Sequence, residues 1–200
     1  MYFVGDEVGG RIRLRVLSFL EVFYNTERYA FMTITITQAD TDTQLQQVRD
    51  LKRAYLAWQK QTYHERLDLL EKYFDPKAFE AELAALPGKF APPSGRLLLA
   101  YYDEVLARTV GLRDFGDQIC EMKSMFVETQ FHGKGIGRAL AEALIEQART
   151  IGYTKMRLDT GPRQTAAQTL YRSLGFQKIE RYYELPLELA ENMLFMELIL

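Results

Sequence analysis

Three glycines directly before an amphipathic helix constrain the fold more than any other feature of this sequence. The stretch QFHGKGIGRALAEALIEQA contains Gly133, Gly135 and Gly137, after which apolar side chains recur at helical spacing. Glycine reaches backbone dihedrals that other residues avoid, and a helix N-terminus offers unpaired N–H groups and partial positive charge. The stretch therefore predicts a loop and helix that bind an anion, usually phosphate, and Gly152 is placed to end the helix.

The spacing of these glycines excludes two common phosphate-binding loops. A dinucleotide fingerprint GxGxxG would need glycine where this chain has Arg138, and no GxxxxGK string followed by Ser or Thr occurs. Lys134 and Arg138 add positive charge to the loop. Taken alone, the loop leaves a glycine-rich turn without a ligand as an alternative.

The segments on both sides of the loop favour one family. Upstream, ICEMKSMFVE is predicted to be a strand; downstream, KMRLDT is predicted to be a second strand, followed by a helix in TAAQTLYRSLGF. This order, together with HGKGIG, resembles the GCN5-related N-acetyltransferase (GNAT) superfamily over residues 119–176. CEMK before the loop and the ending YY…P…ELIL resemble a subgroup of bacterial members that act on small molecules.

The resemblance implies an α/β fold of the acyl-CoA N-acyltransferase type. Its mixed sheet of about seven strands has helices on both faces, and the parallel strands on either side of the loop and its helix splay apart. Residues 32–200 are assigned to this domain. Residues 1–31 are an N-terminal extension, which either lies upstream of a true start at Met32 or packs on the domain as an extra amphipathic segment.

Further elements follow from local patterns. Apolar side chains on one helical face predict a helix through residues 45–58, and Asp75-Pro76 supplies an N-cap for another helix. RLLLAYYD and VLARTVGLRDF predict an antiparallel hairpin that turns near Asp103-Glu104. Residues 192–199 are predicted to form the last strand.

Composition limits the class of protein. A chain of 200 residues with 48% hydrophobic and 26% charged residues is typical of one globular domain, and a net charge of −2 argues against general nucleic-acid binding. The single cysteine, Cys120, excludes an intramolecular disulfide, and no Cys/His spacing suggests a metal site. No apolar run approaches the ~20 residues that span a bilayer. We therefore expect a cytoplasmic protein without metal, nucleic-acid or membrane partners, with Cys120 and Trp58 in its core and a homodimer left open.

The resemblance implies that the chain uses acetyl-CoA as cosubstrate and that a primary amine attacks it directly in a ternary complex. Glu121, on the strand before the loop, is the expected base. Strand alternation would place Lys123, Met125 and Val127 on the same face as this carboxylate. The alternative is that Glu121 pairs with Lys123 or Arg157 and only holds the sheet together.

Tyr171, the tyrosine of LYRSLGF, is implied to be the acid that protonates the leaving thiolate. The alternative role is an aromatic core residue on an amphipathic helix. Tyr182 and Tyr183 either line the acceptor pocket or cover the sheet.

The implied cofactor site runs from the strand through the loop to the second helix. A backbone N–H near Phe126 or Val127 would stabilise the oxyanion. The family has Gln or Arg where this chain has His132, and Asn where it has Gln164. The expected cofactor-binding residues are Met125, Phe126, Val127, His132, Gly133, Lys134, Gly135, Ile136, Gly137, Arg138 and Gln164.

The acceptor is expected to be a small-molecule amine, although a peptide N-terminus or a protein lysine would use the same motifs. The competing function is a CoA-binding regulatory module with little transfer activity. Glu121 and Tyr171 favour the enzyme, because such a module would not need either of them.

Overall fold

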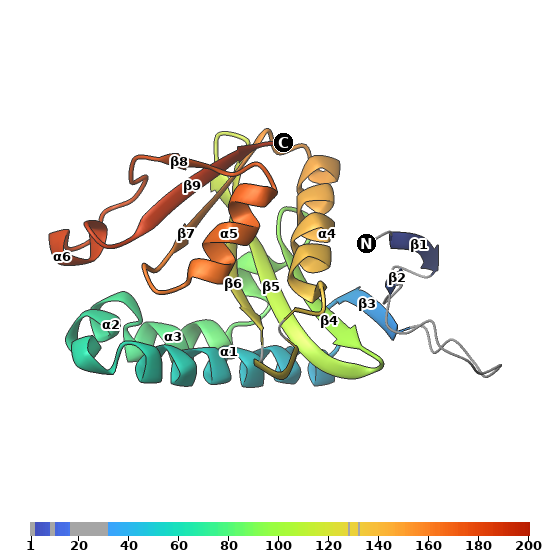
Figure 1. Cartoon of the computed structure of the whole chain (residues 1–200), viewed down its shortest axis with the longest axis horizontal. Coiled ribbons are helices and arrows are strands. Elements are labelled where there is room, and N and C mark those ends of the chain that lie inside the picture. Colours follow the sequence, from blue (N-terminus) through green and yellow to red (C-terminus); the bar gives the residue numbers. More distant parts are fainter. Residues whose placement is uncertain (1–2, 9–10, 17–31, 128, 132) are drawn as a thin grey trace, which may run out of the picture.

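The structure is a computed structural model that describes residues 3–8, 11–16, 32–127, 129–131 and 133–200. Within these ranges a nine-stranded sheet has helices on both faces (Figure 1). The strand order is β1-β2-β3-β4-β5-β6-β7-β9-β8, and only β6 and β7 pair in parallel. The mixed sheet predicted from the resemblance is therefore confirmed, with nine strands in place of about seven.

The strands and helices alternate irregularly along the chain. The strands are β1 (Phe3–Val8), β2 (Arg11–Val16), β3 (Met32–Gln38), β4 (Arg96–Tyr102), β5 (Val105–Gly116), β6 (Ile119–Val127), β7 (Lys155–Thr160), β8 (Gln177–Ile179) and β9 (Leu194–Ile199). The α-helices are α1 (Asp42–Thr62), α2 (Leu67–Tyr73), α3 (Pro76–Ala84), α4 (Ile136–Ile151), α5 (Thr165–Ser173) and α6 (Leu187–Ala190). The strands and the helices that flank the glycine loop, β6, α4, β7 and α5, appear in the predicted order.

The parallel strands β6 and β7 form a fork. They pair at three positions, and the last pair joins Glu121 to Arg157. Beyond that pair β6 continues to Val127 and β7 to Thr160 without further pairing between them. The splay predicted from the resemblance is therefore present, and it leaves backbone groups of both strands facing a gap.

A β-bulge in β6 changes the direction of its side chains. The pairing of β5 with β6 shifts register after Lys123, and Ser124 has a left-handed φ of 57°. An extra residue in a strand reverses the face that later side chains occupy. Met125 accordingly packs against the same core as Cys120, so the prediction that it shares a face with Glu121 and Lys123 is wrong.

Two hydrophobic cores lie on opposite faces of the sheet. The first contains Leu140 and Leu144 of α4, and the second contains Val48 of α1 and Leu83 of α3 (Figure 1). Cys120 is fully buried in the first core, as predicted, and burial raises the pKa of its thiol to about 12. The protonated thiol is a poor nucleophile.

Several local predictions are confirmed. The β4–β5 hairpin turns at Asp103 and Glu104, which both adopt left-handed φ angles. Asp75 caps α3 by accepting a hydrogen bond of 2.7 Å from the backbone N–H of Ala78. Gly152 ends α4 with a φ of 102°.

The first 31 residues include an antiparallel hairpin, β1–β2, whose second strand pairs with β3 at the sheet edge. Residues 17–31 lie outside the described part of the chain. Whether residues 1–31 belong to the native protein stays a prediction. In the described ranges no helix combines the length and apolar character needed to cross a membrane.

Candidate active site

The glycine loop has the geometry of an anion-binding turn. Gly133 and Gly135 both adopt left-handed φ angles, 76° and 77°, and Gly135 is the N-cap of α4. A side chain at Gly133 would project into open space, so its glycine is required by the backbone dihedral rather than by crowding. The first N–H groups of α4 are available to an acceptor that enters from the loop.

Gly137 is required for a different reason. A Cβ atom placed on it would lie 1.7 Å from Nη1 of Arg108. The guanidinium of Arg108 therefore lies directly against the first turn of α4, where only glycine leaves room for it.

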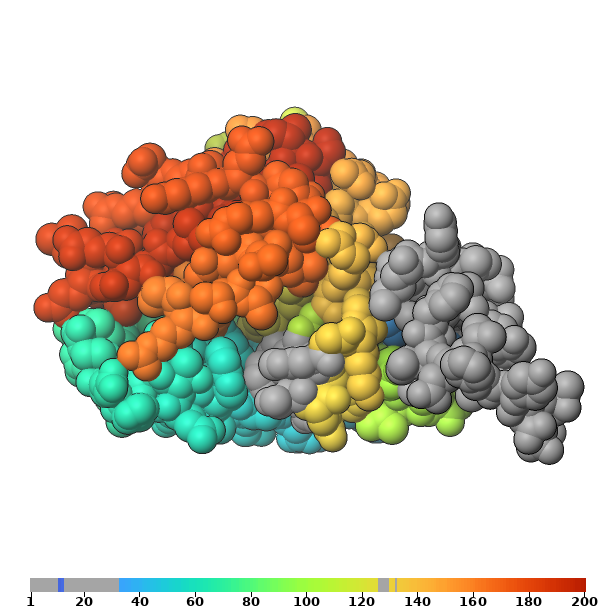
Figure 2. Space-filling model, in the orientation of Figure 1, coloured from blue at the N-terminus to red at the C-terminus, as the bar shows by residue number. Residues whose placement is uncertain are grey.

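A groove of about 510 Å³ extends from this loop to the start of α5. Figure 2 shows the yellow start of α4 beside the orange α5 segment on this face of the molecule. The groove is lined by the loop, by residues of α5 and by the first turn of α4; its lining residues are Tyr55, Trp58, Arg108, Met125, Phe131, Gly133, Gly135, Ile136, Gly137, Arg138, Arg163, Gln164, Thr165, Ala166, Ala167 and Leu170. Trp58 is half-buried and lines the groove, so its prediction as a core residue is wrong.

Arg108 is a buried cation inside this groove. Only 7% of the residue is exposed, and its Nε and Nη1 have no hydrogen-bond partner among the described residues. Burial lowers the pKa of its guanidinium to about 10. A buried charge without a partner is costly, so the groove is suited to an anionic ligand. The loop, the α4 N-terminus and these cations together fit a ligand that carries phosphates, such as coenzyme A.

A second cavity of about 290 Å³ adjoins the groove. It is lined by charged and aromatic side chains from both faces of the fork; its lining residues are Lys52, Tyr55, Tyr73, Phe74, Asp75, Ala78, Phe79, Glu82, Lys89, Phe90, Arg113, Met122, Lys123, Ser124, Met125, Asp159, Gln164, Tyr171, Tyr183 and Leu185. The groove and the cavity share Tyr55, Met125 and Gln164. The two spaces therefore meet at the bulge of β6.

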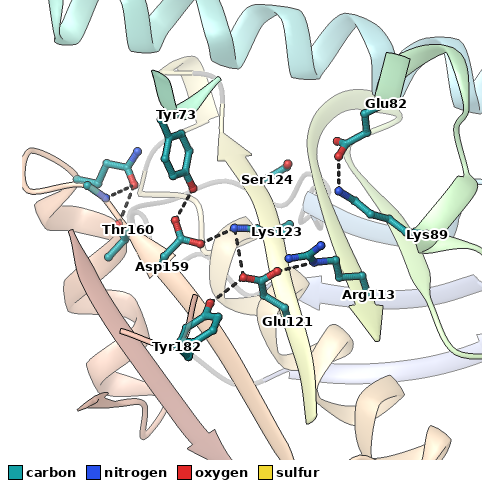
Figure 3. Close-up of polar contacts among 12 residues, drawn as sticks. Tyr73, Glu82, Lys89, Arg113, Glu121, Lys123, Ser124, Asp159, Thr160 and Tyr182 are labelled. Carbon is teal, nitrogen blue, oxygen red and sulfur yellow. Dashed lines mark hydrogen bonds and ion pairs between the residues drawn. The ribbon is translucent and has the colours of Figure 1, made fainter. Parts of the chain in front are cut away.

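Alternating charges connect the strands of the fork at one wall of this cavity (Figure 3). Arg113 Nε lies 2.5 Å from Glu121 Oε2, and Lys123 Nζ lies 3.3 Å from Glu121 Oε1. The same ammonium lies 2.5 Å from Asp159 Oδ1, and the Tyr73 hydroxyl donates to the other oxygen of Asp159. This chain of contacts, which we call the fork network, joins α2, β5, β6 and β7.

Glu121 is fully buried in the fork network. Besides Arg113 and Lys123, the Tyr182 hydroxyl donates to it at 2.7 Å, so both carboxylate oxygens have donors. Of the two pairings that the sequence suggested, the one with Lys123 exists, whereas Arg157 pairs with Glu197. Glu121 is not among the residues that line the groove or the cavity. Its role as a base stays a prediction.

A second group of charges closes the opposite wall. Lys52 of α1 is 2% exposed, and its Nζ lies 2.6 Å from Glu82 Oε1 and 3.3 Å from Ser124 Oγ. Glu82 also pairs with Lys89 at 2.5 Å. Burial would raise the pKa of the Glu82 carboxyl, but the two ammonium groups outweigh it and lower that pKa to about 2.

Tyr171 lines the cavity, and the preceding residue, Leu170, lines the groove. It is 6% exposed, and burial, reinforced by neighbouring Tyr55, raises its pKa well above the ordinary value, while Arg108 acts in the opposite direction. The phenol therefore stays protonated at neutral pH and can donate a proton. Gln164 holds the adjoining Tyr55 hydroxyl through its Nε2 at 3.1 Å.

The remaining expected site residues divide into three groups. Tyr183 lines the cavity, whereas Tyr182 does not, and neither lies on a strand. Lys134 places its ammonium over the ring of Tyr102, 4.5 Å from the centroid, and is not among the groove residues. His132 lies outside the described residues.

Phe126 and Val127 form the end of β6 and pair with β5 there. Their expected N–H contact with an oxyanion stays a prediction.

Sequence reasoning missed several charged residues of the site, among them Lys52, Arg108 and Asp159. Each carries a signal in the sequence, because Lys52 interrupts the apolar face of a helix and Arg108 is the only charge in VLARTVGL. Asp159 ends a strand that was expected to be covered on both faces. A charge at such a position must find a partner or a ligand.

The acetyltransferase (GNAT) family model matches residues 46–176 of this chain. An uncharacterized N-acetyltransferase of Schizosaccharomyces pombe is 34% identical over 58% of this chain and 71% of its own length. One of Dictyostelium discoideum is 29% identical over 54% of this chain and 78% of its own. The chain belongs to the GNAT family and is an N-acetyltransferase.

Other similarities are more limited. The human N-acetylaspartate synthetase is 34% identical, over 52% of this chain and 36% of its own length. The solved structure of PaiA N-acetyltransferase from Thermoplasma acidophilum in complex with coenzyme A has a TM-score of 0.61 and 16% identity, over 84% of this chain and 99% of that chain. That likeness supports the fold alone. Because the curated relatives named here are eukaryotic, the resemblance to a bacterial subgroup stays a prediction.

Proposed function

We propose that the protein transfers the acetyl group of acetyl-CoA to the primary amine of a small molecule, by direct attack in a ternary complex. The observation that carries this proposal is the meeting of two spaces at the bulge of β6. The groove with the anion-binding loop and the charged cavity share Met125 and Gln164, and Tyr171 lines the cavity while its sequence neighbour Leu170 lines the groove. Each space would hold one substrate, with the reacting atoms where the spaces meet.

The cosubstrate would be held by backbone more than by side chains. The N–H groups of the loop and the α4 N-terminus would bind its phosphates, supported by Arg138. The unpaired edge of β6 beyond Glu121 would bind the pantetheine arm as an added strand does. When bound, acetyl-CoA supplies an electrophilic thioester.

Tyr171 is proposed to give its proton to the leaving sulfur, because it is protonated at neutral pH and lines the cavity that meets the groove. The acceptor must reach the thioester as a neutral amine, although an ordinary amine with a pKa near ~10 is mostly protonated. Glu121 is kept as the proposed base, and Asp159, which lines the cavity, is the group to compare with it.

The cavity supports a small acceptor. Its volume of about 290 Å³ lies at the lower limit of ordinary ligand pockets, and its walls carry both signs of charge. An amine that also carries a carboxylate would find partners of both kinds. Cytoplasmic location and dimerisation stay predictions of the sequence.

The test measures acetyl-CoA turnover by the purified protein with a panel of small amines. The release of free CoA thiol reports the turnover. The panel includes aspartate, since one relative is an N-acetylaspartate synthetase, together with polyamines, amino sugars and a lysine peptide. Tyr171→Phe, Glu121→Gln and Asp159→Asn are run beside the wild type. Loss of a general acid or base costs about 100- to 10,000-fold in rate.

Tyr101→Phe is the matched control, because its hydroxyl donates to Gln47 of α1 and Tyr101 lines neither space. Turnover that Tyr171→Phe slows and Tyr101→Phe leaves intact supports the proposal. Tight acetyl-CoA binding without acetylation of any amine would favour a CoA-binding module. Equal rates for Glu121→Gln and wild type would remove Glu121 from the mechanism.

A further inference from the structure

Contacts with the described residues do not explain why Arg108 is buried in the fold. It lies on β5, opposite Val127 at the end of β6, and is 7% exposed. Its Nε and Nη1 lack partners within the described part of the chain. Replacement of an isolated buried cation by an apolar side chain is usually neutral or stabilising, so its presence points to a ligand.

The surroundings of Arg108 identify the part of the groove that it serves. Nη1 lies against Gly137 on the side of α4 that faces the sheet. Tyr171 is the ionisable group whose charge interacts with the guanidinium. Arg108 thus lies between the phosphate loop and the proposed proton donor, deep in the groove, where apolar Met125 and Leu170 line the wall.

We propose that Arg108 stabilises the negative charge that develops on the sulfur of the cosubstrate as it leaves, and on the oxygen of Tyr171 once that proton has been given. This inference rests on the proposed function, and it assigns Arg108 as a further residue of the same site. The cation is fixed before the reaction begins, so no reorganisation is needed when the charge appears.

The step balances without any further reactant. The lone pair of the neutral amine forms the new C–N bond, and the C–S bond breaks with its electron pair on sulfur. The proton of the Tyr171 hydroxyl moves to that sulfur, and the proton lost by the amine leaves to the base and solvent. Arg108 keeps all its protons and acts by charge alone, which its pKa of about 10 allows at neutral pH.

The competing assignment is that Arg108 binds a phosphate of the cosubstrate. The exposure of the loop argues against it, because Gly133 is open to solvent and suits a hydrated phosphate, whereas Arg108 is buried. The two assignments differ in a measurable way. A phosphate contact changes affinity for the nucleotide half, and a contact with the sulfur changes the acidity of the thiol.

The first experiment titrates the thiol of bound CoA through the ultraviolet absorbance of its thiolate, with the acetyl-CoA complex as blank. It needs no amine, so it is independent of the acceptor. We expect the bound thiol to be about tenfold more acidic in the wild type than in Arg108→Met. Tyr55 of α1, Tyr171 of α5 and Asp159 of β7 face the same region and are unchanged in both proteins.

Two further variants complete the set. Arg108→Lys keeps the charge and should retain most of the acidity. Arg149→Met is the control: it removes an exposed arginine from the last turn of α4, where it forms an ion pair with Glu146. Thermal unfolding checks each fold, and Arg108→Met should not be less stable than the wild type. If it fails to fold, Arg108→Gln takes its place.

The second experiment compares acetyl-CoA with acetyl-pantetheine, which lacks the phosphates. We expect Arg108→Met to lower kcat about 100-fold with both donors. If Arg108→Met raises KM for acetyl-CoA but not for acetyl-pantetheine, the proposal is overturned and Arg108 is assigned to a phosphate contact. An unchanged thiol titration would overturn it as well. Absence of turnover in the wild type would count against the proposed function and leave the titration to decide on Arg108.

Discussion

At the residue scale, Glu121 has two competing roles: a base that takes the proton of an amine, and an anion that holds charged strands together. Its carboxylate is fully buried and accepts from Arg113, Lys123 and Tyr182. A base must reach its proton directly or through one water. The three donors fill the first shell around this carboxylate, so at least one of them must yield before it can act.

The same burial makes a stability prediction that does not depend on catalysis. Glu121→Gln leaves Arg113 and Lys123 partly buried without their shared anion, which typically costs about 3 kcal/mol in the free energy of unfolding. Urea unfolding measures it. Glu146→Gln, an exposed partner of Arg149, is the control and should cost less than about 1 kcal/mol. Equal stability of both variants would mean that the fork network does not hold the sheet.

Gly137 makes a second residue-scale prediction. In Gly137→Ala the new methyl group would displace the guanidinium of Arg108, and such overpacking costs about 1–3 kcal/mol in unfolding free energy. The same substitution should cost at least about 1 kcal/mol less in an Arg108→Met background, because the colliding atoms are gone. A double-mutant cycle in urea measures the difference. Additive effects would show that the two residues are not in contact.

At the element scale, Lys52 and Glu82 join α1 to α3. Their ion pair of 2.6 Å is backed by Lys89 on the following loop and by Ser124 at the bulge of β6. The ammonium of Lys52 therefore links α1 to Glu82 of α3 and to Ser124 of β6. The cavity wall that contains Lys52, Glu82 and Lys89 therefore depends on the ionisation of the Glu82 carboxyl.

Acid should weaken this connection in a defined pH range. The pKa of Glu82 falls from its ordinary 4.5 to about 2 on folding, so its ionised form stabilises the protein above pH 4.5. That contribution, at most about 3 kcal/mol, is lost as the pH falls from 4.5 toward 2, while Lys52 stays protonated in both states. Urea unfolding between pH 6 and the acid limit of folding should show a steeper decline for the wild type than for Glu82→Gln. Parallel curves would contradict the pairing.

How far the sequence predicts the site differs between elements. The loop and both ends of α4 follow from local rules, because Gly133, Gly135 and Gly152 need left-handed dihedrals whatever surrounds them. The bulge at Ser124 has no such signal, since one extra residue in a strand leaves the composition unchanged. The prediction of the sheet face on which Met125 lies was wrong for this reason.

Contacts between segments that are distant in the chain also could not be predicted from the sequence. The separation between Lys123 and Asp159 is 36 residues, and the one between Lys52 and Ser124 is 72. Strand alternation and helical periodicity assign a side chain to one face of its own strand or helix. They do not identify the element against which that face packs. The fork network and its partner groups therefore became visible only in the folded chain.

At the scale of the whole molecule, the sheet has two strands more than the expected seven, which is the number that the β1–β2 hairpin adds. The hairpin pairs with β3 at one edge, and β8 pairs with β9 at the other. Among the residues whose burial is described, the buried members of the two cores lie at residue 34 or later, and Ile12 is partly buried against the first core. The hairpin is thus an addition to a domain whose site lies elsewhere.

A chain that begins at Met32 should therefore fold and bind acetyl-CoA with unchanged affinity. We expect its unfolding temperature to fall by no more than about 4 °C, which corresponds to ~1 kcal/mol for a domain of this size. The loss of β2 would expose the backbone edge of β3, and an unpaired edge invites pairing with a second copy. Sedimentation at several concentrations, with the full chain as control, would detect that association. Loss of folding or of acetyl-CoA binding would instead make residues 1–31 part of the domain, because the edge strand would then supply stability that the two cores do not.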